Sequence, residues 1–137
     1  MISRATYLIS DITKWPEQLE SKPGVYEIVA LDRTGKPKAI SRVGGVDGRG
    51  VLYIGRGKKL REERLNRLRK GLFEGKRGHI AGRTYLERHR IQAVAPKRDL
   101  AFRFEHCNDY KDRENQRLRH YIQKFGEVPP LNASQGG

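Results

Sequence analysis

Gly24-Val25-Tyr26 and Tyr53-Ile54-Gly55 are two short strand-like runs, and each joins one tyrosine to one glycine. Tyrosine favours strands, and a neighbouring glycine lets the backbone turn or a ligand approach closely. An arginine-rich segment, residues 56 to 70, follows the second run at once. We expect the two strands to pair antiparallel, which places Tyr26 near Tyr53 when their side chains share a face. Two phenols beside a cationic helix suit the chemistry of a phosphodiester.

The segment after Gly55 predicts an amphipathic helix. Leu65, Leu68 and Leu72 recur at i, i+3 and i+7, so one face packs inward and the basic side chains point elsewhere. Residues 56 to 70 hold eight basic and two acidic side chains. The helix therefore presents a strongly cationic surface directly behind the second tyrosine run.

The tyrosine runs and the arginines behind them resemble the GIY-YIG nuclease superfamily. Valine replaces isoleucine in Gly24-Val25-Tyr26, whereas Tyr53-Ile54-Gly55 matches without change. The resemblance spans residues 23 to 132, nearly the whole chain. It implies a small, standalone endonuclease that hydrolyses phosphodiester bonds in DNA with a divalent metal ion, Mg²⁺ or Mn²⁺.

The resemblance also implies roles for five residues in order along the chain. Tyr26 would act as the general base or orient the water, with Tyr53 as its partner. Arg64, one residue later than the usual spacing, would clamp the scissile phosphate. Glu114, in the last helical run, would bind the metal ion, and Asn132 would have a structural or substrate-positioning role.

The chemistry sets requirements on these groups. Hydrolysis needs a positioned water, a base for its proton and positive charge on the pentavalent phosphate. A phenol with an ordinary pKa of about 10 is a poor base, so nearby positive charge must favour deprotonated Tyr26, or a metal ion must share the activation of the water. One carboxylate suits a divalent ion that keeps several waters. Basic neighbours on the same helix are expected to keep Glu114 ionised. They are Lys111, Arg113 and Arg117.

One position departs from the pattern of the family. Four residues after the arginine the family usually has histidine or tyrosine, whereas this chain has Leu68. Three explanations stay open. The proton relay at this position is dispensable, or another group such as His79 replaces it, or catalysis is impaired.

The composition indicates an anionic partner. The chain has 29 Lys and Arg against 16 Asp and Glu, and its net charge is +13, far beyond what solubility needs. A second cluster, residues 76 to 98, holds seven basic side chains and one acidic. Such clustering is typical of nucleic-acid binding, and the short apolar faces argue against a membrane surface. The predicted nucleic-acid contacts are Arg56, Lys58, Lys59, Arg67, Arg77, His79 and Arg83.

Length and cysteine content indicate a single domain in a reducing compartment. A chain of 137 residues is large enough for a modest core. Cys107 is the only cysteine, which excludes a disulfide framework or a Cys-x-x-Cys site. The apolar run Tyr7-Leu8-Ile9 is too short for a signal peptide or a membrane span. We therefore expect a cytoplasmic protein.

The pattern of the chain predicts an α+β fold, a three-stranded antiparallel sheet flanked by helices. Residues 1–22 form a lead-in anchored by Trp15, residues 23–132 the GIY-YIG-like domain, and residues 133–137 a tail. Strands are predicted at Val25 to Leu31, Val51 to Gly55 and Leu100 to His106, with a further short strand at Ala39 to Val43. Helices are predicted in the arginine-rich segment, at Ile80 to Val94, and from Asp109 onward with Asp112 completing a rough capping box.

Other functions fit parts of this pattern. Gly55-Arg56-Gly57 lies between a strand and a helix, as a dinucleotide-binding turn would, but Leu60 stands where the third glycine belongs and the βαβ repetition is missing. The chief alternative is a catalytically weak or inactive nucleic-acid-binding module of the same fold. Composition does not separate a DNA-directed from an RNA-directed nuclease. One active site cuts one strand, so double-strand cleavage would require a homodimer or two successive visits.

Overall fold

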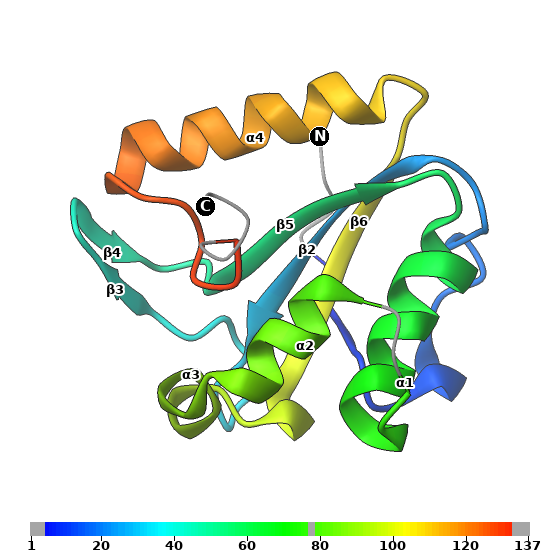
Figure 1. Cartoon of the computed structure of the whole chain (residues 1–137), viewed down its shortest axis with the longest axis horizontal. Helices are drawn as coiled ribbons and strands as arrows, with labels where there is room; N and C mark the ends of the chain where they lie inside the picture. The colour runs from blue at the N-terminus through cyan, green and yellow to red at the C-terminus, as the bar shows by residue number, and fades with distance from the viewer. Residues whose placement is uncertain (1–4, 77–78, 133–137) are drawn as a thin grey trace.

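A four-stranded antiparallel sheet forms the centre of the chain in the computed structural model, which describes residues 5–76 and 79–132 (Figure 1). In sheet order the strands are β1 (Tyr7–Leu8), β6 (Leu100–His106), β2 (Gly24–Ala30) and β5 (Val51–Gly57). The α+β class is confirmed. The three-stranded sheet was wrong by one strand, because Tyr7 and Leu8 pair with Phe102 and Ala101 at the edge of β6. A two-residue strand has no sequence period of its own, so only the paired edge defines it.

Strand β2 lies inside the sheet between β6 and β5, and all of its seven residues are buried. It pairs with β5 in the expected antiparallel direction, with Tyr26 opposite Gly55 and Ile28 opposite Tyr53. Because side chains alternate across a strand, this register brings Tyr26 and Tyr53 to the same face of the sheet. The predicted pairing of the two tyrosine strands is therefore confirmed.

The long connection between β2 and β5 contains a second, two-stranded sheet. It consists of β3 (Ile40–Arg42) and β4 (Gly45–Asp47), and β3 lies within the short strand predicted there. The backbone N–H of Gly44, at the turn, donates to the carbonyl of Phe125 at 2.8 Å. A Cβ at Gly44 would lie 2.9 Å from the carbonyl carbon of Phe125, so only glycine lets this hairpin approach the end of α4 so closely.

In the described chain, the α-helices come from two parts, between β5 and β6 and after β6. A π-helical turn (Leu60–Leu65) leads into α1 (Asn66–Glu74), followed by α2 (Ile80–Glu87), α3 (His89–Val94) and, after β6, α4 (Tyr110–Phe125). Short 3-10 turns lie at Ile12–Lys14 and Lys97–Asp99. The single helix predicted over Ile80 to Val94 is instead two helices, because the backbone leaves the helical region at Arg88 (φ −114°, ψ 86°). Asp109 precedes α4 as expected, but its side chain caps no backbone N–H among the described residues.

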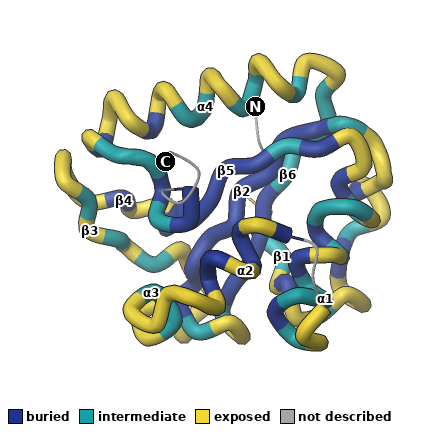
Figure 2. Tube along the Cα trace, viewed as in Figure 1, coloured by how far each residue is buried: buried dark blue, intermediate teal, exposed yellow. Residues whose placement is uncertain are grey.

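The two faces of the sheet are covered by different helices, and the buried strands lie between them (Figures 1 and 2). Leu65, Leu68 and Leu72 pack beneath one face together with Tyr26 and other residues of the main core, as the leucine spacing predicted. Trp15 belongs to the same cluster and is 6% exposed, so it is the predicted anchor. On the opposite face Tyr121 and Phe125 of α4 pack on a smaller cluster. Over residues 5–76 and 79–132, no helix has the length and apolarity to cross a membrane.

A buried ionic network holds α4 against the sheet. The carboxylate of Glu27, on β2, is 3% exposed and pairs with Arg49 at 3.1 Å, Arg103 at 3.2 Å and Arg117 of α4 at 3.8 Å. A buried carboxylate needs such partners, and removing one side of the network leaves an uncompensated charge. Arg117 lies three residues after Glu114, so the network also determines which way α4 turns Glu114.

Candidate active site

Tyr26 and Tyr53 lie side by side on the face of the sheet that α1 and α2 cover. Their ring centroids are 6.0 Å apart and the rings are tilted by 39°. Gly55, opposite Tyr26, makes this possible, because a Cβ there would lie 2.6 Å from Cζ of Tyr26 and 2.5 Å from Cε2 of Tyr53. The glycine of the second run is therefore a packing requirement of the tyrosine pair.

Gly57 makes room for Arg64 in the same way. A Cβ at Gly57 would lie 2.6 Å from Cγ and 2.9 Å from Nε of Arg64. That Nε is buried and has no hydrogen-bond partner among the described residues. Arg64 belongs to the π-helical turn, which closes i→i+5 instead of i→i+4 hydrogen bonds and often occurs at functional sites.

His79 completes the cluster from the start of α2. Its Nε2 lies 2.6 Å from the hydroxyl oxygen of Tyr26, and its ring meets those of Tyr26 and Tyr53 edge-on at 5.9 Å each. Its Nδ1 accepts the backbone N–H of Ala81 at 3.1 Å, so His79 is the N-cap of α2. The sequence predicted a histidine facing phosphates; the structure places it inside, only 8% exposed, against the tyrosines.

The backbone contact determines the tautomer of His79. Because the N–H of Ala81 can only donate, Nδ1 carries the lone pair and Nε2 carries the proton in the neutral ring. Burial, and to a lesser extent the positive charge of Arg64, lower the pKa of His79 to about 3. His79 is thus a neutral imidazole that donates its Nε2–H to the oxygen of Tyr26.

The hydroxyl of Tyr26 is strongly held in its protonated form. Burial is the largest cause that raises the pKa of Tyr26 well above its ordinary value, and the charges of Tyr53 and Glu114 act in the same direction. Arg64 lowers the pKa, as expected from the sequence, but burial outweighs it. Tyr26 therefore acts by hydrogen bonding in this state rather than as a base.

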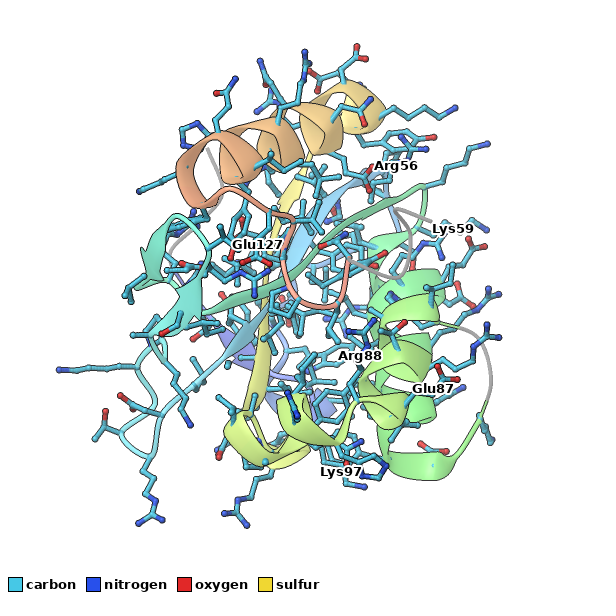
Figure 3. The ribbon with its side chains drawn as sticks, turned by 60° about the vertical axis from the view of Figure 1, so that its left-hand side comes forward. Arg56, Lys59, Glu87, Arg88, Lys97 and Glu127 are labelled. Atoms are coloured by element: carbon cyan, nitrogen blue, oxygen red, sulfur yellow. The ribbon has the colours of Figure 1, made fainter. Side chains whose placement is uncertain are left out.

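Glu114 approaches the cluster from α4, on the other side of strand β5. Its carboxylate lies 3.7 Å from the guanidinium of Arg56, and its side chain is 17% exposed. Burial raises the pKa of Glu114, while Arg56 and then Arg64 lower it. In Figure 3, Arg56 lies between the end of β5 and α4. One glutamate therefore interacts with cations from both β5 and the π-helical turn.

The basic neighbours expected around Glu114 lie elsewhere. Arg113 and Arg117 instead pair with Glu105 of β6, at 3.1 Å and 3.0 Å, and Lys111 is exposed on α4. The sequence correctly placed Glu114 on a basic helix. It did not show that residues 113 and 117 turn toward the sheet, because that depends on the rotation of α4.

A divalent ion at this site would have one protein carboxylate. The described residues hold no group of three or more His, Cys, Asp or Glu side chains that could bind a metal ion. A single, half-buried glutamate fits a Mg²⁺-type ion, which keeps several waters and takes further oxygens from substrate phosphates. Glu114 is the residue that would hold it.

Asn132 makes two hydrogen bonds to the backbone of Ile54 at the outer edge of β5. Its Oδ1 accepts the N–H of Ile54 at 2.9 Å, and its Nδ2 donates to the carbonyl of Ile54 at 3.0 Å. The N–H of Leu131 adds a bond to the carbonyl of Leu52 at 2.8 Å. Of the two roles that the resemblance implies for Asn132, these contacts describe the structural one: it satisfies an open strand edge next to Tyr53.

The predicted phosphate contacts differ in exposure. Lys58, Lys59, Arg67 and Arg83 are exposed, whereas Arg56 is engaged with Glu114 and His79 with Tyr26. Figure 3 shows Lys59 where the chain leaves β5 for the helices. Arg77 lies outside the described residues. The site residue that sequence reasoning missed is Gly57, although the Gly55-Arg56-Gly57 spacing was its visible signal.

No family model matches the chain, and no match is found among curated proteins or among solved structures. The resemblance to the GIY-YIG superfamily therefore rests on the sequence motifs alone and stays an expectation.

Proposed function

We propose that this protein is a divalent-metal-dependent endonuclease that hydrolyses phosphodiester bonds in DNA. The observation that supports it most is the convergence of two tyrosines, a neutral histidine, an arginine and a glutamate on one end of β5. Tyr26 is the common member: His79 bonds its hydroxyl, and Arg64 and Glu114 both act on its pKa. These groups come from β2, β5, the π-helical turn, the start of α2 and α4.

The chain's own residues divide the work as follows. Arg64 places its charge beside the tyrosines and has a buried Nε without a described partner, so it is suited to clamp the phosphate as negative charge develops. The hydroxyls of Tyr26 and Tyr53 orient the attacking water. His79 holds the hydroxyl of Tyr26 in one direction through its Nε2–H, and its neutral ring does not compete with Arg64 for the phosphate.

Glu114 is the proposed metal ligand. A bound divalent ion would supply positive charge to the phosphate and lower the pKa of a water. Activation of the water by a metal ion is more necessary than the sequence suggested, because the raised pKa of Tyr26 leaves its phenol a poor base. The second expectation from the sequence, that a metal ion shares the activation of the water, is the one we propose.

His79 offers an explanation for the departure at Leu68. Leu68 is 1% exposed and packs in the main core, so it takes no part in proton transfer. His79 contacts Tyr26 from α2 instead. We propose that a histidine from the next helix performs here the role that the family usually gives to the residue four positions after the arginine.

The exposed cations support a nucleic acid as the substrate. Lys58 and Lys59 directly follow β5, Arg67 lies on α1, and all three are exposed. Phosphate contacts of this kind position a substrate without reading its sequence. RNA stays an alternative substrate on the same electrostatic grounds. One site cuts one strand, so cleavage of both strands would involve a homodimer or two visits.

A second candidate, a nucleic-acid-binding module without cleavage, is favoured by one observation. Tyr26 is only 1% exposed and Tyr53 only 7%, so a water must reach hydroxyls that are almost enclosed. The two candidates share the charged surface and differ only in whether the tyrosine cluster is reached by a water.

A plasmid-nicking assay distinguishes the endonuclease from the binding module. The purified protein is incubated with supercoiled plasmid in the presence of Mg²⁺ or Mn²⁺, with and without excess chelator. We expect nicked plasmid that depends on the metal ion and disappears with chelator. Tight binding of DNA and RNA with no cleavage of either, across several divalent ions, would reject the enzyme and support the binding module.

A further inference from the structure

A groove between α1 and α2 opens directly beside the tyrosine cluster. It encloses a cavity of about 490 Å³, within the size range of small-ligand sites. Arg64 and His79, two members of the cluster, form part of its wall. The groove therefore adjoins the tyrosine cluster through these two side chains.

The lining of the groove combines two kinds of side chain. Lys76 and Arg83 are exposed cations that join Arg64 around it. Ile80 and Leu86, on α2, are large apolar side chains that are 57% and 44% exposed. The backbone approaches without side chains at Gly71 and Gly75, which leaves the groove open on the side of α1.

An intact duplex offers little surface that suits both kinds of side chain, because apart from the thymine methyl groups its grooves present mainly polar base edges. Its bases are stacked inside, so a helix groove at its surface contacts phosphates and sugars, for which charged and polar groups suffice. Apolar side chains gain free energy against apolar surface, and the largest apolar surface that a nucleic acid can present is the face of an unstacked base. Exposed isoleucine and leucine between cations are therefore suited to one base with its phosphates.

We infer that this groove binds an unpaired nucleotide next to the scissile phosphate. The inference rests on the proposed function and names its substrate class: DNA with an unpaired nucleotide at the cleavage point, such as a bulge or a single-stranded flap, in preference to uniform duplex. The base lies on Ile80 and Leu86, and the flanking phosphates lie on Arg64, Lys76 and Arg83.

The test is a binding measurement in excess chelator, so that cleavage plays no part. A duplex with one bulged fluorescent adenine analogue is compared with a fully paired duplex that carries the same analogue. We expect the bulged probe to bind about tenfold more tightly, the scale of stacking one base, and its fluorescence to change on binding. Ile80→Gln and Leu86→Gln should each remove most of that preference and leave the affinity for paired duplex unchanged.

Ile122→Gln is the matched control. Ile122 is 41% exposed on α4, outside the groove, so this variant should keep the preference of the parent. Equal affinity of the parent for both probes would overturn the inference, even where the plasmid is nicked. A preference lost equally in all three variants would overturn it too.

The outcomes separate the inference from the proposed function. If the protein prefers the bulged probe through Ile80 and Leu86 but cuts neither probe after metal is added, the proposed nucleotide groove is supported. The proposed endonuclease activity is then rejected. If the protein cuts paired duplex as fast as bulged duplex and binds both equally, the endonuclease activity is supported. The proposed nucleotide groove is then rejected.

Discussion

Nε2 of His79 lies 2.6 Å from the hydroxyl oxygen of Tyr26, while Nδ1 of the same ring accepts the backbone N–H of Ala81. The start of α2 thus sets which nitrogen of His79 carries the proton, and that proton points at the tyrosine. A helix cap and a candidate catalytic contact are made by one imidazole. A change at the start of α2 that moves His79 would therefore alter its contact with Tyr26.

Tyr26→Phe should separate binding from cleavage. The ring keeps its packing against Tyr53, so the fold and the affinity for DNA persist, whereas cleavage falls by about 10²-fold, the scale of acid–base and water-orienting contributions. Steady-state nicking rates and DNA affinities measure the two effects. Tyr53→Phe serves as comparison and should be the milder change. Unaltered cleavage by Tyr26→Phe would make the first tyrosine purely architectural.

Glu114→Gln tests the metal ligand. The amide keeps the shape of the side chain and loses the charge that holds the cation, so cleavage should disappear. Without metal, DNA affinity should equal or exceed that of the parent, because Arg56 is released from its pair at 3.7 Å. Metal-dependent nicking and metal-free binding are measured together. Cleavage at the parental rate would move the metal ligand to Asp109, Asp112 or Glu105.

Asn132→Ala tests a structural role. It removes both bonds to the backbone of Ile54, and a buried backbone group left unsatisfied costs about 1–3 kcal/mol. We expect the free energy of unfolding in urea to fall by that amount. Cleavage per folded molecule should fall much less than in Tyr26→Phe, because the amide contacts the strand edge and not the tyrosine hydroxyls. A variant of full stability and no activity would contradict this assignment.

His79 predicts a specific acid sensitivity. Its pKa is lowered to about 3 in the folded protein and is about 6.5 in an unfolded chain. The unfolded state therefore binds the extra proton as pH falls from about 6.5, and the folded state binds it only near 3. This group contributes stability above that window and loses it within the window, by up to about 1.4 kcal/mol per pH unit.

The measurement is urea unfolding of the parent and of His79→Gln across that window. Carboxylates titrate in both proteins, so the difference between the two curves isolates the histidine. The difference in the free energy of unfolding between the parent and His79→Gln should decrease steadily as the pH falls through that window. Parallel curves would show that His79 is already accessible to protons in the folded protein.

Salt dependence tests the phosphate contacts. If about four to six phosphates are neutralised, log affinity against log salt should slope near about −4 to −5. Arg67→Ala should weaken binding of all sequences alike and make the slope shallower by about one. Arg33→Ala removes the same charge from an exposed turn beyond the far end of β2, so it should change the slope less. A flat salt response in the parent would remove the nucleic-acid partner.

Much of the fold was readable because its signals are periodic. The leucine spacing of residues 65 to 72 placed the buried face of α1, and the alternation over Leu100–His106 placed β6 with its observed bounds. The second helix was predicted as one piece because Arg88 has no local signal for a break. Strand β1 was missed because two residues have no period, and the sheet edge alone recruits them.

By itself the sequence determined the class of fold, the pairing of the two tyrosine strands and the excess of positive charge, since these follow from local spacing and composition. Only the tertiary structure decided the chemistry of the tyrosine pair. Burial raises the pKa of Tyr26 and lowers that of His79, and the neutral tautomer depends on a backbone N–H two residues away. The rotation of α4 about its axis lets Glu114 pair with Arg56, and lets Arg113 and Arg117 pair with Glu105. Desolvation and pairing depend on which groups pack together across the fold, and no spacing along the chain encodes them.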